Sequence, residues 1–422
     1  MPNRRLPVRP DLEQLRHQAK DLLREAHAGE PPALADFAQF HPRAIDPAEA
    51  TLADAQLVLA RSYDAQSWPR LVHACALVDA IWRDDVDAVR GLVQKYPALL
   101  HEPALVRPES NWGPPMSYAA NIGRDRIIDA LLELGATDLE TAVDRAALQG
   151  RVDTARRLHQ RLGAPRPDAR ALGGPAYTLS VPGTELMLEL GAPVRDAQGR
   201  GIAPVDVVLE TDSRDPAAKH AILELYAAHG LELPDTPTMA LHRGRIDLLE
   251  RHLARDPSLL RRTFAFEEIY PPELGCHDAV LATHGTPLGG TTLLHMCVDY
   301  DELDIARWLL ARGMEVDEPA AIDGDGFGGH TALFASVVSQ PNFWMNRRGG
   351  PFDAPFTVLL LEHGANPNAR ASLRKQMHPG YGPDVLREYR DVTPLSWGQR
   401  FVHTTFVSAP AMQLITAHGG HA

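Results

Sequence analysis

Cysteine and long apolar runs are scarce in this sequence of 422 residues. The three cysteines, Cys75, Cys276 and Cys297, lie far apart and form no C-x-x-C pair, so neither a zinc knuckle nor a disulfide framework is predicted. We expect reduced, mostly buried thiols. No stretch approaches the ~20 consecutive apolar residues that a membrane-spanning helix requires. A protein that crosses a membrane is therefore not predicted.

The sequence also lacks an excess of basic residues. It contains 55 Asp and Glu against 42 Lys and Arg, and its formal net charge is −13. Nucleic acids and anionic membrane surfaces repel a chain of this charge, so we expect neither as a partner. No apolar segment follows the arginines at positions 4 and 5, so a secretory signal peptide is not predicted. These features favour a cytoplasmic protein.

Short segments recur along the chain with a regular spacing. Leu-Gly-Ala begins at Leu134, Leu162 and Leu190, at intervals of 28 residues, and each copy follows an apolar stretch of helical periodicity. A glycine in this position ends a helix because it adopts positive φ without steric cost. Thr292 and Thr331 precede other apolar stretches, where a threonine side chain accepts a hydrogen bond from the first helical turn. The pattern predicts pairs of short helices.

A unit of capped helix, turn, second helix, glycine stop and extended loop resembles the ankyrin repeat, whose fingerprint is T-P-L-H-x-A followed by L-L-x-x-G-A. The best match begins at 329–333 and ends at 359–368. The resemblance covers about residues 75–420. It implies an all-α ankyrin-repeat solenoid of about eight or nine helix pairs, with a concave surface formed by the first helices.

We predict three segments along the chain. Residues 1–72 form a helical cap that covers the open end of the repeat core, and they resemble the leader that precedes ankyrin repeats in many bacterial proteins. Residues 73–263 form compact and degenerate repeats. Residues 264–422 form repeats that carry long loop insertions. Because long ordered insertions are often functional, we expect the functional site in this last segment.

The insertions lie at about 264–290, 316–328, 340–353 and 371–391. They hold histidine, carboxylate and aromatic side chains, which can hydrogen-bond a polar ligand or act as acid and base. The candidate ligand-binding residues, including two on an earlier loop and helix start, are Trp112, Tyr118, Tyr270, His277, Asp299, His330, Trp344 and Trp397. If the protein is an enzyme, the candidate catalytic residues are Glu267, His284, His295 and Asp323.

Several of these residues also have a structural interpretation. In the ankyrin fingerprint the histidine at the position of His295 bonds neighbouring loop backbone, and His330 precedes the capping Thr331. Trp112 either stacks on a ligand or packs under the preceding loop. The polar segment 210–216 is interpreted as a solvated turn.

No metal or cofactor is predicted. His277 and His284 are seven residues apart and lack H-E-x-x-H spacing. The segment 323–326 resembles the start of a calcium loop, but Phe334 stands where that loop needs a glutamate. The glycines at 326–329 follow no predicted strand and lack the lysine of a phosphate-binding loop.

The sequence therefore favours a monomeric binding protein that holds a protein partner or a small polar ligand on its concave face and long loops. The alternative is an enzyme that uses a pocket rich in His, Asp and Glu in the C-terminal half for acid–base chemistry on a small molecule. Convergence of the four candidate catalytic side chains on one point would favour the enzyme. Separate contacts within the loops would favour the binding protein.

Overall fold

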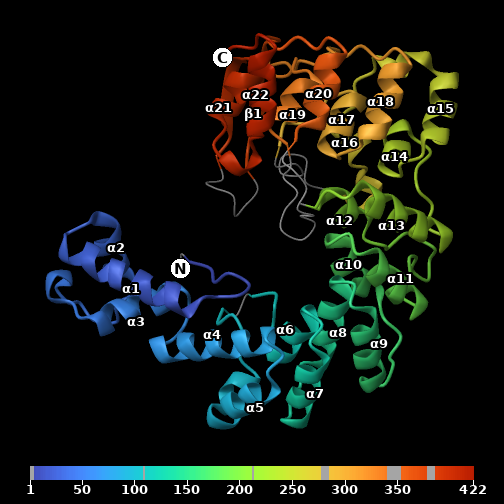
Figure 1. Cartoon of the computed structure of the whole chain (residues 1–422). Coiled ribbons are helices and arrows are strands. Elements are labelled where there is room, and N and C mark those ends of the chain that lie inside the picture. The colour runs from blue at the N-terminus through green and yellow to red at the C-terminus, as the bar shows by residue number, and fades with distance from the viewer. Residues whose placement is uncertain (1–3, 108–109, 212, 277–284, 340–352, 378–384) are drawn as a thin grey trace. The chain divides into compact units, whose positions relative to one another are not determined.

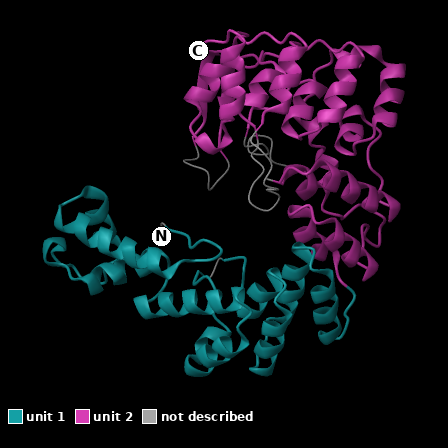
Figure 2. Ribbon diagram, in the orientation of Figure 1, with its two compact units in different colours: residues 1–166 teal, residues 167–422 magenta. Residues whose placement is uncertain are grey.

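The computed structural model describes residues 4–107, 110–211, 213–276, 285–339, 353–377 and 385–422 (Figure 1). The chain divides into two compact units, unit 1 from Met1 to Arg166 and unit 2 from Pro167 to Ala422 (Figure 2). The described residues form 22 α-helices, six short 3-10 helices and one two-stranded sheet. The predicted predominance of helix is confirmed.

Unit 1 begins with α1 (Leu12–His27), α2 (Pro31–Phe40), η1 (Pro47–Glu49) and α3 (Leu52–Ser62). Asp11 caps α1 because its carboxylate accepts hydrogen bonds from two backbone N–H groups of the first turn. α1 packs against α2 and α3 and contributes Leu15 and Leu22 to the core between them. Leu71 and Cys75 of the following helix belong to the same core. The first three helices and the next one thus share one apolar interior.

The rest of unit 1 consists of three helix pairs. They are α4 (Trp68–Trp82) with α5 (Val86–Lys95) and η2 (Pro97–Leu100), α6 (Pro115–Asn121) with α7 (Asp125–Glu133), and α8 (Leu139–Leu148) with α9 (Val152–Arg161). Successive pairs pack on each other, since α6 contacts both α4 and α8, and α5 contacts α7.

Unit 2 contains six helix pairs. The first three are α10 (Gly173–Tyr177) with α11 (Val181–Glu189), α12 (Val205–Glu210) with α13 (Pro216–Ala228), and α14 (Pro237–His242) with α15 (Ile246–Arg255). The last three are α17 (Leu293–Asp299) with α18 (Leu303–Ala311), α19 (Ala332–Val337) with α20 (Pro355–Glu362), and α21 (Pro394–Arg400) with α22 (Ala409–Ala417). Three short 3-10 helices accompany them: η3 (Ala169–Leu172) before α10, η4 (Pro257–Leu260) after α15, and η6 (Thr404–Phe406) before α22. The last three pairs stand side by side (Figure 1). The described residues therefore contain nine pairs, within the predicted eight or nine.

The predicted starts and stops of these helices are present. Gly135, Gly163 and Gly191 follow the ends of α7, α9 and α11 with φ angles of 97°, 90° and 97°. A side chain would strain the backbone at such angles. Thr292 precedes α17 and Thr393 precedes α21. Local sequence signals thus define where the helices begin and end.

Two insertions contain regular structure. The first forms α16 (Phe266–Ile269) and η5 (Pro272–Leu274). The last, which we expected to be a loop, contains β1 (Ala371–Lys375) and β2 (Arg387–Val392), paired antiparallel with a register irregularity after Ala371. Ala371, Leu373 and Lys375 are buried while the residues between them are half-exposed, which is the alternation of a strand on a core.

Candidate functional site

His295 and His330, two of the predicted site residues, are buried side by side in unit 2. The His295 ring lies 2.9 Å from the hydroxyl of Thr292 through Nδ1 and 3.0 Å from the carbonyl oxygen of His330 through Nε2. The His330 Nε2 lies 3.0 Å from the carbonyl oxygen of Pro287. Burial lowers the pKa of His295 to about 4 and that of His330 to about 3. Both rings are therefore neutral at physiological pH and are engaged with backbone.

The other candidate catalytic residues occupy different surroundings. Glu267 is exposed in α16. Asp323 lies on an exposed turn, accepts hydrogen bonds from two backbone N–H groups and forms an ion pair with Arg374. His284 lies outside the described residues, as do His277 and Trp344 of the ligand-binding set. The described members of the catalytic set thus make separate contacts.

The predicted aromatic residues mainly pack inside their own units. In unit 1 the buried Tyr118 donates a hydrogen bond to the carbonyl oxygen of Val8 and accepts one from Trp82 Nε1. Trp112 is half-exposed, with its ring centroid 5.0 Å from that of Tyr118. In unit 2 the buried Trp397 donates to the Thr286 hydroxyl at 3.0 Å. Tyr118 and Trp397 therefore have their polar atoms satisfied within the protein.

Asp299 belongs to a set of buried side chains, four charged and one aromatic, that we call the ion cluster; it is made of Arg214, Lys219, Asp299, Tyr300 and Glu302. Arg214 Nη2 lies 3.0 Å from Asp299 Oδ2, and Arg214 Nε donates to the Asp299 carbonyl oxygen at 2.9 Å. The two side chains are only 4 % and 2 % exposed. This ion pair joins the α12–α13 turn to the end of α17.

A second ion pair of the cluster joins α13 to the start of α18. Lys219 Nζ lies 2.9 Å from Glu302 Oε1, and His220 Nε2 lies 2.7 Å from the same oxygen. Burial lowers the pKa of Lys219, and Glu302 only partly offsets this effect. Burial by itself would raise the pKa of Glu302, but Lys219 and His220 hold it below its ordinary value. The charges are thus paired where water is excluded.

Tyr300 connects the two ion pairs. Its ring centroid lies 4.2 Å from Lys219 Nζ and 4.8 Å from Arg214 Cζ, within the range of cation–π attraction. The His242 ring meets it edge-on at 4.7 Å, and Tyr270, another predicted site residue, lies 6.4 Å away. All of these side chains are buried. The cluster therefore fastens α12–α13 to α17–α18 and presents no open surface to a ligand.

The ion cluster corrects one sequence interpretation. Segment 210–216 was expected to be a solvated turn, but Thr211, Ser213 and Arg214 are 4 %, 2 % and 5 % exposed. The physical reason is that Arg214 reaches a buried carboxylate and also donates to the carbonyl oxygen of Thr211 at 2.6 Å. A charge so compensated can leave water.

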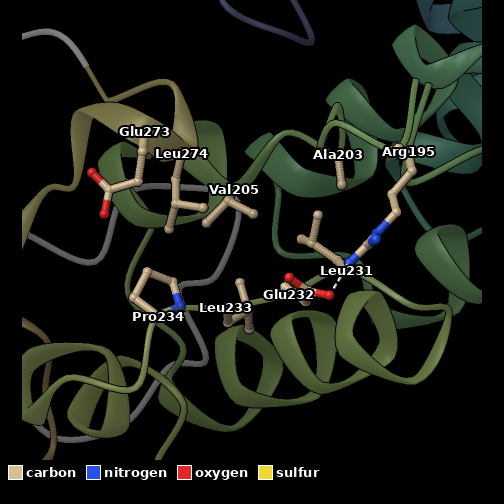
Figure 3. A pocket seen from close by; sticks show the side chains of 11 residues that line it. Arg195, Ala203, Val205, Leu231, Glu232, Leu233, Pro234, Glu273 and Leu274 are labelled. Atoms are coloured by element: carbon tan, nitrogen blue, oxygen red, sulfur yellow. Dashed lines mark ion pairs between the residues drawn. The ribbon is translucent and has the colours of Figure 1, made fainter. Parts of the chain in front are cut away.

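A pocket with a volume of about 400 Å³ lies elsewhere in unit 2, between the loop that precedes α12, the loop that follows α13, and η5 (Figure 3). We call it the loop pocket; its apolar lining consists of Ala203, Val205, Leu231, Leu233, Pro234 and Leu274. A Cβ atom on Gly201 would lie 2.8 Å from a methyl carbon of Leu231. Glycine at this position therefore allows the loop that precedes α12 to approach the loop that follows α13 closely. None of the sequence-predicted site residues that the structure describes lines this pocket.

Three charged side chains also line the loop pocket. Arg195 Nη2 lies 3.1 Å from Glu232 Oε1. The Glu232 side chain is 92 % exposed, the Arg195 side chain is 33 % exposed, and Glu273 is exposed. In Figure 3 Glu273 and Arg195 lie on opposite sides of Val205, Leu231 and Leu233, and Glu232 lies next to Leu231 and Leu233. The pocket therefore offers both apolar side chains and charged groups.

Within the described part of the chain, no three His, Cys, Asp or Glu side chains are grouped so that they could hold a metal ion. None of the described helices is both long enough and apolar enough to span a bilayer.

Comparison with known protein families finds a match for one segment of the chain. The ankyrin repeat family model matches residues 289–323, which include α17 and α18. No curated protein matches the chain. Among solved structures, the ankyrin repeat domain of human ASB11 is 14 % identical with a TM-score of 0.21, over 82 % of this chain and 98 % of that one. The ankyrin repeat domain of Bcl-3, a member of the IkappaB protein family, is 15 % identical with a TM-score of 0.20, over 81 % and 97 %.

The fold is shown by the helix pairs and by the family match. Together these agree with the predicted all-α ankyrin-repeat fold. Residues 289–323 are an ankyrin repeat.

Proposed function

We propose that this chain is a binding protein that holds a segment of a protein partner in the loop pocket. The observation that carries the proposal is that three loops of successive helix pairs together line a pocket that contains both apolar and charged side chains. Its volume of about 400 Å³ lies within the range of ligand-binding pockets. The ankyrin resemblance supports the same function, because most proteins of this kind bind other proteins.

The distribution of perturbed ionisable groups supports binding over catalysis. A catalytic pocket contains ionisable side chains whose pKa values are shifted toward the pH at which they act. Here the pKa values of His295 and His330 are strongly lowered by burial, but neither residue lines the loop pocket. The charges of the ion cluster are likewise buried and paired.

We further propose that the chain acts as a monomer in the cytoplasm, and light scattering of the purified protein would test its oligomeric state.

The first prediction tests the pocket with an uncharged polar group in place of one of its apolar side chains. We expect Leu233→Gln to weaken the binding of pocket-directed peptides at least tenfold, because the amide would have to lose its water when an apolar side chain docks. Short random peptides displayed on phage would be selected on the immobilised full chain. The selected sequences would then be synthesised, and their affinities measured by fluorescence anisotropy.

Ile322→Gln is the matched control, since Ile322 is an exposed apolar residue of unit 2 that does not line the pocket. It should bind the peptides like the original protein. Thermal melting of both variants would show whether the fold is retained. If no peptide is enriched, or if Leu233→Gln binds the enriched peptides unchanged, the proposed function is wrong.

A further inference from the structure

We infer that the partner segment held in the loop pocket carries a basic side chain close to an apolar one. This inference rests on the proposed function, and it specifies the chemistry of the partner. It follows from the balance of charges around the pocket, from the apolar side chains that lie among these charges, and from the fixed shape of the loop that precedes α12.

The charges that line the loop pocket have an excess of one negative charge. They are two carboxylates, Glu232 and Glu273, and one guanidinium, that of Arg195. The guanidinium is already matched by Glu232 at 3.1 Å, so its charge is largely compensated within the protein. Glu273 has no such cation among the other pocket-lining side chains. An incoming cation is therefore attracted, mainly by Glu273, whereas an incoming anion would meet an excess of one negative charge.

The exposure of these carboxylates favours a side chain with a long reach. Glu232 is 92 % exposed and Glu273 is exposed, so both project from the rim and are not buried in the floor. A lysine or arginine can lay its apolar stem on the pocket wall while its charged end remains at the rim. Arginine also has the planar geometry that pairs with a carboxylate through two hydrogen bonds.

The wall between the charges favours an apolar neighbour for that basic residue. Val205 and Leu231 are 1 % and 6 % exposed and form the base of the wall, while Leu233 and Leu274 are half-buried. An apolar side chain that covers the last two would remove additional apolar surface from water, which is favourable in proportion to its area. Figure 3 shows Val205, Leu231 and Leu233 between Glu273 and Arg195, with Glu232 beside Leu231.

The loop that carries Arg195 is held in shape before any partner binds. Its two ends pair through a backbone bridge between Arg195 and Gly201. The Asp196 carboxylate accepts hydrogen bonds from the backbone N–H groups of Gln198 and Arg200, each at 2.9 Å. A loop that is already ordered loses little entropy on binding. The position of Arg195 next to Glu232 is therefore a feature of the free protein.

The test reverses the charge of both rim carboxylates in the full chain. Peptides are selected from the phage-displayed random library on the original protein, and we expect the enriched sequences to share a lysine or arginine near an apolar residue. In the double variant Glu232→Arg/Glu273→Arg, the affinity for these synthetic peptides should fall about tenfold or more. The affinity for the original protein should also fall as salt is raised, because rim charges are screened.

Glu362→Arg is the matched control, because Glu362 is exposed in unit 2 and does not line the pocket. It should leave the affinity unchanged. Enriched peptides without a basic residue, or with acidic ones, would overturn the inference. So would basic peptides that bind the double variant as well as the original protein. In either case, weaker binding by Leu233→Gln would keep the proposed function, whereas failure to enrich any peptide would overturn both.

Discussion

Replacing Asp299 with alanine should lower the free energy of unfolding of unit 2 by about 3–5 kcal/mol. The substitution removes the carboxylate that lies 3.0 Å from Arg214 Nη2 and leaves a guanidinium buried without its counter-charge. Arg214 also lies 4.8 Å from the Tyr300 ring, which cannot replace a full negative charge. Urea denaturation of the full chain, followed by circular dichroism, would measure the loss.

A surface ion pair supplies the matched control for this prediction. Arg312 Nη2 lies 2.6 Å from Glu250 Oε1 in unit 2, and both side chains are well exposed. Glu250→Ala should cost about 0–1 kcal/mol, because water and salt compensate an exposed charge. Equal losses in Glu250→Ala and Asp299→Ala would contradict the role that we assign to burial.

A double substitution separates loss of the pair from loss of packing. Arg214→Met with Asp299→Leu removes both charges together and keeps apolar volume in the interior. We expect this double variant to be more stable than Asp299→Ala alone. The recovery should be partial, because the carbonyl oxygen of Thr211 loses the hydrogen bond that it accepts from Arg214. A double variant less stable than Asp299→Ala would show that the arginine acts mainly through contacts other than the ion pair.

The helix pairs could be predicted from the sequence because their signals are local. Glycines such as Gly135 and Gly191 end a helix through their own backbone angles, and Thr292 acts on the first turn that follows it. The ring of His295 illustrates the same point, since the fingerprint predicts a bond to loop backbone and the ring lies 3.0 Å from the carbonyl oxygen of His330. These effects operate over a few residues or within one repeating unit.

Strand pairing and the ion cluster could not be predicted because their partners are distant in sequence. β1 pairs with a strand that begins at Arg387, so neither segment is a strand by itself. Arg214 is separated from Asp299 by 85 positions. A polar stretch such as 210–216 is usually solvated. Here the carboxylate of Asp299, distant in sequence, makes the burial of Arg214 favourable. No property of the segment alone indicates that partner.

The loop pocket escaped prediction for a related reason. Its lining comes from three short segments of ordinary composition, and its two carboxylates are common on surfaces. The sequence directed attention to histidines and aromatic residues, yet His295, His330 Nε2 and Trp397 make hydrogen-bond contacts inside unit 2. Rare side chains were thus used to build the fold, whereas the pocket arises where loops of successive helix pairs come together.

Lowering the pH from 7 to 5 should destabilise the neighbourhood of α17 and α19, because two buried histidines resist protonation there. Burial places the pKa of His295 at about 4 and that of His330 at about 3, while a histidine in the unfolded chain has a pKa near 6.5. Above pH 6.5 both states bind no proton at these rings and the full stability is present. As the pH falls below 6.5 the unfolded state takes up protons that the folded state excludes. Each ring therefore loses about 2 kcal/mol of stabilisation by pH 5.

His330→Gln isolates this effect at one ring. The glutamine amide does not titrate, and it can still donate a hydrogen bond to the carbonyl oxygen of Pro287, as His330 Nε2 does at 3.0 Å. Urea unfolding at the two pH values should show a difference about 2 kcal/mol smaller in this variant than in the original protein. His242, whose pKa burial also lowers, acts in the same direction and is retained in both proteins. The exposed His418 gives the control His418→Gln, which should keep the original difference. If the difference in unfolding free energy between the two pH values is undiminished in His330→Gln, the prediction is wrong. The loss of stability in acid would then come from groups other than His330.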